Sequence, residues 1–166
     1  MNLGAENRYD EALIHGASAL GLYRQAGHKV GEALSLNAIG WCHAHLGQPR
    51  LALEFCGEAL KAHREAGHRS GEADTWDSLG YAHRVSGDLA EAAEAYGHAL
   101  EIFRDLGDRY NQALGHLCLG DIASERGRSD EARQNWTAAL EILKEISHPE
   151  VITVMDRLNS GVPTLS

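Results

Sequence analysis

Trp76-Asp77-Ser78-Leu79-Gly80-Tyr81-Ala82-His83, followed by Ala92-Ala93-Glu94-Ala95-Tyr96-Gly97-His98-Ala99-Leu100, is the stretch that decides the fold. Its apolar and small residues recur at helical spacing on both sides of Gly87, which predicts two helices joined by a turn. The same residue types return forty residues earlier and later, in columns such as Gly40, Gly80, Gly120; Gly47, Gly87, Gly127; Gly27, Gly67, Gly107; Ala52, Ala92, Ala132; and Ala59, Ala99, Ala139. A fixed period between about 20 and 50 residues marks an array of structural repeats.

Composition and charge narrow the class of protein. The 166 residues are 43% hydrophobic but only 6% aromatic, which fits helices packed through small residues. The net charge of −9 argues against binding to a nucleic-acid backbone, which needs clustered Lys and Arg. We find no apolar run of the roughly 20 residues that a membrane span needs and no signal peptide at Met1, so we expect a cytoplasmic protein without membrane contact.

The expected architecture is all-α, with antiparallel helix pairs. A helix is predicted over Tyr9–Ala26, and its forty-residue equivalents are second helices of pairs. Three full pairs and a short final helix follow. The predicted organisation is a half repeat at 7–28, full repeats at 29–68, 69–108 and 109–148, and a capping helix at 149–160.

The first helix therefore lacks the partner that its equivalents have. Such a helix would expose an apolar face. Either the chain is a fragment of a longer array, or another chain, such as a second copy in a homodimer, covers that face.

Three glycines inside predicted helices need a reason, because glycine costs about 1 kcal/mol there relative to alanine. Gly40, Gly80 and Gly120 share one phase of the repeat. We expect the paired helix to approach closely at each of them, with the alanines of the column that begins at Ala52 facing the glycines.

The chain from Tyr9 onward resembles the tetratricopeptide repeat family. The residues that carry the resemblance in the best-matching repeat are Trp76, Leu79, Gly80, His83, Ala92, Tyr96 and Ala99. Two departures stand out: His83 replaces the usual Tyr, and the period is 40 residues instead of 34. The resemblance implies a right-handed α-α superhelix that binds a protein or peptide and is not an enzyme.

The longer repeat is similar to two groups within that family. One is the C-terminal region of AfsR and SARP-type bacterial transcriptional regulators, in which stretches such as Gly40-Trp41-Cys42-His43-Ala44-His45-Leu46-Gly47 and Thr75-Trp76-Asp77-Ser78-Leu79-Gly80-Tyr81-Ala82-His83 are typical. This resemblance implies a regulatory region whose DNA-binding part lies elsewhere. The alternative is a free-standing scaffold or self-associating adaptor, as in LGN-like proteins.

The resemblance also implies a concave wall built from the first helices of the pairs. The predicted partner-binding residues on that wall are Asn37, Trp41, His45, Asp74, Asp77, Tyr81, Arg84, Leu117, Asp121 and Glu125. Because the wall carries four acids and one Arg, with Trp41 and Tyr81 as anchors, we expect an apolar or basic partner.

Catalytic and metal-binding motifs are not found. His43 and His45 lie two apart on a helix and point to different sides, and there is no His-Glu-x-x-His or paired Cys-x2-Cys. Cys42, Cys56 and Cys118 are expected to be reduced, buried thiols. We therefore expect no metal, no cofactor and no catalytic residue; an enzyme remains a distant alternative.

Overall fold

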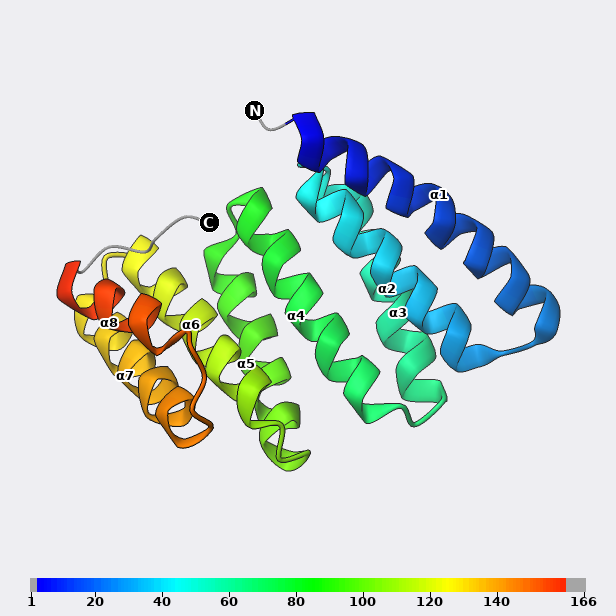
Figure 1. Cartoon of the computed structure of the whole chain (residues 1–166). Coiled ribbons are helices and arrows are strands. Elements are labelled where there is room, and N and C mark those ends of the chain that lie inside the picture. Colours follow the sequence, from blue (N-terminus) through cyan, green and yellow to red (C-terminus); the bar gives the residue numbers. More distant parts are fainter. Residues whose placement is uncertain (1–2, 161–166) are drawn as a thin grey trace. The chain divides into compact units, whose positions relative to one another are not determined.

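The computed structural model describes residues 3–160, and over this range the chain forms eight α-helices and no strand. The helices are α1 (Leu3–Ala26), α2 (Lys29–His45), α3 (Pro49–Glu65), α4 (Arg69–Ser86), α5 (Leu89–Asp105), α6 (Arg109–Glu125), α7 (Ser129–Glu145) and α8 (Val151–Ser160) (Figure 1). Helix α1 begins six residues earlier than the predicted Tyr9, because no proline interrupts helical backbone between Leu3 and Arg8. The first helices of the pairs are predicted at 29–46, 69–86 and 109–126, and their boundaries, like those of the other helices, lie within two residues of the predicted ones.

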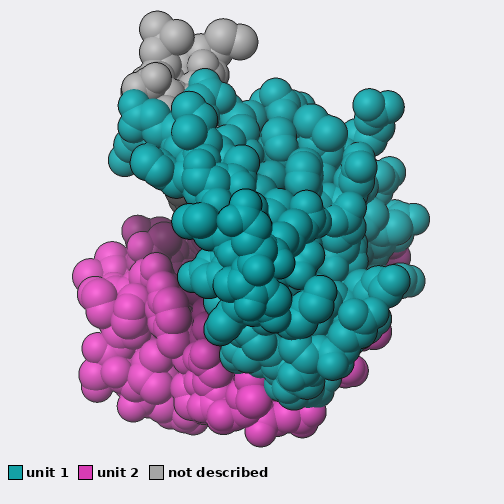
Figure 2. Space-filling view, turned by 90° about the vertical axis from the view of Figure 1, so that its right-hand side faces the viewer, with its two compact units in different colours: residues 1–95 teal, residues 96–166 magenta. Residues whose placement is uncertain are grey.

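The chain divides into two compact units, residues 1–95 and residues 96–166, coloured teal and magenta in Figure 2. The division falls inside α5. In unit 1, α2 packs against α1, α3 and α4, and α3 also packs against α4. In unit 2, α7 packs against α6 and α8.

The first seven helices all end in the same turn. After α1, for example, the Gly27 N–H donates to the carbonyl of Arg24 at 3.2 Å, and the His28 N–H donates to that of Tyr23 at 2.9 Å. Gly27 has a φ of 66°, a conformation that glycine adopts without steric cost. Ser147 takes the equivalent place after α7 with a φ of 55°. Each of these seven helices therefore ends at the equivalent residue of its repeat.

The predicted close approach of the paired helix is confirmed at Gly40 and Gly120. A Cβ atom on Gly40 would lie 2.4 Å from Cys56 Sγ and 3.1 Å from the Ala52 carbonyl oxygen. A Cβ atom on Gly120 would lie 2.5 Å from the Trp136 ring. The nearest side chain thus belongs to the residue four positions after the expected alanine.

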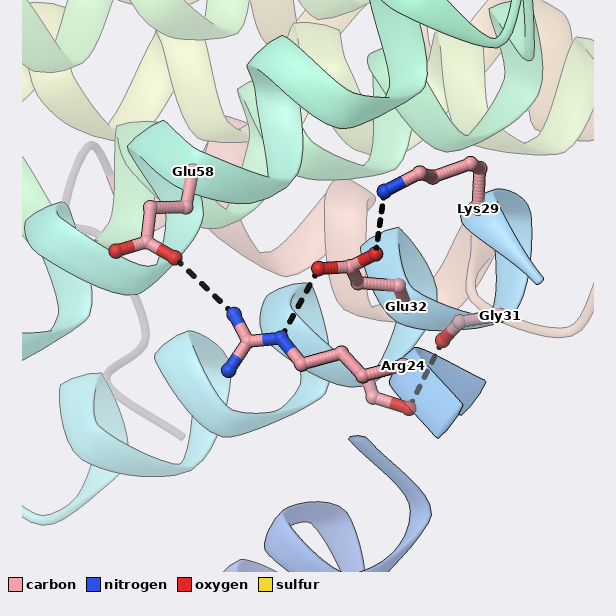
Figure 3. A network of polar contacts seen from close by, with 6 residues as sticks. Arg24, Lys29, Gly31, Glu32 and Glu58 are labelled. Atoms are coloured by element: carbon pink, nitrogen blue, oxygen red, sulfur yellow. Dashed lines mark hydrogen bonds and ion pairs between the residues drawn. The ribbon is translucent and has the colours of Figure 1, made fainter. Parts of the chain in front are cut away.

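Charged clamps join successive repeats. At the first junction, Arg24 of α1 binds Glu32 of α2 at 3.0 Å and approaches Glu58 of α3 at 3.7 Å, while Lys29 binds Glu32 at 3.2 Å (Figure 3). Hydrogen bonds from Arg24 and Lys29 lower the pKa of Glu32. The clamp therefore holds the start of α2 against α1.

The clamp recurs forty residues later. Glu72 of α4 accepts from Arg64 of α3 and from Arg69, both at 2.9 Å. Burial alone would raise the pKa of Glu72, but the two guanidinium partners outweigh burial and lower it. Both first helices of unit 1 are thus fixed at their beginnings.

We predict that Gly40→Ala destabilises the protein although alanine is the better helix former. The gain in helix propensity is about 1 kcal/mol, whereas overpacking against Cys56 and the α3 backbone costs about 1–3 kcal/mol. Gly57→Ala is the matched control, because Gly57 lies in mid-helix with no atom within 4 Å of an added Cβ. Urea denaturation should show a lower free energy of unfolding for Gly40→Ala and an unchanged or higher one for Gly57→Ala. Equal effects would contradict the close packing.

Candidate functional site

Seven of the ten predicted wall residues lie in unit 1, on α2 and α4, which pack against each other (Figure 1). Trp41 follows Asn37 by one helical turn on α2, and Tyr81 follows Asp77 by one turn on α4. All four side chains are half-buried. We call the surface formed by Asn37, Trp41 and His45 of α2 with Asp74, Asp77, Tyr81 and Arg84 of α4 the α2/α4 face.

One end of the α2/α4 face is an aromatic cluster of Tyr9, Trp41, His45 and Tyr81. The His45 ring is stacked between the rings of Tyr9 and Tyr81, with centroid distances of 4.6 Å to each. Trp41 meets the His45 ring edge-on at 4.5 Å and lies 5.3 Å from Tyr81. The cluster joins α1, α2 and α4, and it places two large, half-exposed rings side by side.

His45 is held neutral at the centre of this cluster. Burial lowers the pKa of its imidazole. Its Nδ1 atom lies 3.5 Å from the Tyr81 hydroxyl, while Nε2 is buried and has no hydrogen-bond partner within the described part of the chain. Burial, together with Tyr9, raises the pKa of Tyr81, so its hydroxyl keeps its proton at neutral pH.

The carboxyl group of Asp77 lies one turn before Tyr81 and titrates unusually. Burial, with a smaller contribution from the neighbouring Asp74 carboxylate, raises the pKa of Asp77 to about 6. Asp74 itself is exposed. At neutral pH the Asp77 carboxyl group is therefore ionised, although its surroundings favour the protonated form.

Asn37 and Arg84 are the remaining predicted residues of unit 1. Asn37 accepts a hydrogen bond from the Cys56 thiol of α3 at 3.7 Å. Burial raises the pKa of Cys56 to about 12, so the thiol stays protonated. Arg84 is half-buried at the last turn of α4.

Two of the predicted residues of α6 are buried in unit 2. Leu117 is only 8% exposed and belongs to the core of unit 2. The Asp121 carboxylate accepts a hydrogen bond from Trp136 Nε1 at 2.9 Å and lies 3.4 Å from the Arg157 guanidinium of α8. Little of either side chain is therefore exposed to a partner. Glu125 is exposed at the end of α6.

Tyr9 belongs to the aromatic cluster, although the sequence did not point to it. Its forty-residue equivalents are Pro49, Leu89 and Ser129, so no column identifies it as an anchor. Its contact with His45 depends on where α1 lies against the end of α2, which is a tertiary property.

The structure also shows the state of the cysteines and whether side chains that could bind a metal ion come together. All three cysteines are free; Cys42 and Cys56 are buried as expected, whereas Cys118 is only half-buried. Over residues 3–160 we find no group of three His, Cys, Asp or Glu side chains placed to share a metal ion. Over the same range, no helix is both long enough and apolar enough to cross a bilayer.

The eight helices, paired and joined by turns that recur every forty residues, define a helical-repeat protein. The chain belongs to the tetratricopeptide repeat family, whose model matches residues 2–65, 42–105 and 71–145. Repeats of this family generally mediate protein–protein interactions and are typically non-catalytic scaffolds. A comparison with curated proteins finds no match.

Two solved structures are similar in fold. RapI in its apo form is 19% identical, with a TM-score of 0.74 over 89% of this chain and 43% of RapI. BtubC from P. vanneervenii is 17% identical, with a TM-score of 0.78 over 92% of this chain and 65% of BtubC. The chain thus spans less than two thirds of each. The predicted all-α solenoid class is confirmed.

We predict that Asp77 titrates near pH 6 in the free protein, well above its ordinary value of 3.8. Asp74→Asn should lower the pKa of Asp77, because it removes a neighbouring negative charge. Carboxyl carbon shifts followed by NMR between pH 3 and pH 8 measure both values. A pKa near the ordinary value in the unmodified protein would show that the α2/α4 face does not bury this carboxyl group.

Proposed function

We propose that the protein binds a protein or peptide partner on the α2/α4 face of unit 1. The observation that carries the proposal is the pair of half-exposed rings of Trp41 and Tyr81, 5.3 Å apart. Large aromatic side chains contribute most strongly to protein interfaces when neighbouring contacts exclude water from them. The fixed starts of α2 and α4 support the proposal, because a surface already in its binding conformation loses little entropy on binding.

The biological setting that we propose is the regulatory region of a bacterial transcriptional regulator in the cytoplasm. The similarity of the stretches at 40–47 and 75–83 to AfsR and SARP-type regulators supports it. An antibody raised against the chain would test it through the size of the native product. A band much larger than 18.0 kDa would support a multidomain regulator, and one near 18.0 kDa would favour a free-standing scaffold.

The partner-binding proposal predicts that Trp41→Ala and Tyr81→Ala abolish binding while the protein stays folded. Peptide pools should be screened for those that raise the melting temperature of the unmodified chain. Both variants should lose that gain while circular dichroism shows the parental helix content. Tyr110→Ala on α6 removes an aromatic ring outside the face and should keep the gain. If all three variants retain it, the α2/α4 face is not the binding surface.

Self-association through α1 is a second candidate, supported by the exposure of two large apolar side chains. Ile14 and Leu22 are each 67% exposed. Polar residues stand at the positions equivalent to Ile14, namely Glu54, Glu94 and Gln134, so the repeat itself does not require an apolar residue there. Leu20, in contrast, is buried against Leu36 and Ile39 and cannot face another chain.

If α1 mediates a homodimer, the mass measured by analytical ultracentrifugation should rise with concentration. The double variant Ile14→Asp and Leu22→Asp should then be monomeric, because two charges would have to be buried in the interface. Ile152→Asp on α8 is the control, since Ile152 is 70% exposed at a different site. A monomeric parent at all concentrations would exclude this candidate.

A further inference from the structure

We infer that the partner presents a cationic side chain, Lys or Arg, which sits against the Tyr81 ring and pairs with the Asp77 carboxylate. The inference rests on the proposed function, and it goes further by naming the chemical group recognised and the residue that recognises it. It also chooses between the apolar and basic partners that the sequence left open.

Asp77 differs from the other acids that are buried or half-buried on the first helices. Those acids each pair with a cation: Glu32 with Arg24 and Lys29, Glu72 with Arg64 and Arg69, and Asp121 with Arg157. In the described part of the chain, Asp77 makes no such pair and no hydrogen bond, and only burial and the Asp74 carboxylate affect its pKa. A shielded carboxylate without a cation is costly, and a cation brought by a partner would offset that cost.

The repeat architecture does not explain an acid at this position. The equivalent residues are Asn37 in α2, Leu117 in α6 and Arg157 in α8. One is polar and neutral, one is apolar and one is basic. The fold therefore tolerates a neutral residue here. The acid at position 77 is a particular property of α4, as expected of a residue that recognises a partner.

The surroundings of Asp77 suit an organic cation. Tyr81, one turn away, and Trp41 beside it offer ring faces that attract ammonium and guanidinium groups. Asp74, one turn before Asp77, adds a second negative charge, whereas Arg84 lies beyond Tyr81 toward the end of α4. The two acids attract a cation and Arg84 repels it, so the partner's cation should lie next to Asp77 and not next to Arg84. A metal ion is less suited, because no third ligand joins the two carboxylates in the described part of the chain.

The test is a selection of random nine-residue peptides on the unmodified chain at pH 7.5. The selected peptides should be enriched in Lys or Arg. Asp77→Asn should weaken their binding by about tenfold or more, the usual effect of losing a charge-assisted hydrogen bond. Binding to the parent should also weaken below pH 6, where Asp77 takes up a proton, and this pH dependence should be absent in Asp77→Asn.

Two further variants keep the result interpretable. Glu54→Gln removes one negative charge from the exposed surface of α3 and should bind like the parent. Asp77→Leu introduces the residue found at the equivalent position 117 and should also lose binding, which guards against a folding defect peculiar to Asn.

Selected peptides that lack basic residues, or that bind Asp77→Asn as tightly as the parent, would overturn the inference and leave the α2/α4 face as a binding surface for other peptides. A selection that enriches no peptide at all would overturn both this inference and the proposed function.

Discussion

The close contact between a glycine of a first helix and a side chain of its paired second helix is the constraint on which the structure depends. At Gly40 the missing Cβ leaves room for Cys56, and at Gly120 it leaves room for the Trp136 ring. The backbones can therefore approach closely enough to bury the neighbouring alanines, Ala52 and Ala132, almost completely. Each glycine gives up helix propensity, and the packing it permits offsets that loss.

The close packing of each helix pair determines which side of the first helix is left for other contacts. Because α2 and α4 are held against α3 and are clamped at their beginnings through Glu32 and Glu72, their opposite side remains for other contacts. Aromatic rings and one unpaired acid occupy that side. A repeat scaffold can vary such residues freely, since its stability comes from the packed faces and the turns.

Much of the fold could be predicted from the forty-residue period. The turns follow from glycines that take positive φ, and the helix pairs follow from the small-residue columns. Trp41, His45 and Tyr81 could be placed on one face because they lie four or forty residues apart. Tyr9 could not, because its contact arises between helices that the period does not relate. The burial of Leu117 and Asp121 could not be predicted either, because it depends on contacts with other helices, such as those of Asp121 with Trp136 and Arg157, which do not follow from spacing.

The most direct test of the account is an NMR map of the chain with the tightest peptide from the selection. We predict that the Trp41 indole signal and the backbone amides of Asn37, Asp77 and Tyr81 move most, while the indole signals of Trp76 and Trp136 move little. Changes confined to α1 around Ile14 and Leu22, or to the exposed surface of α3, with an unmoved Trp41 signal, would contradict it.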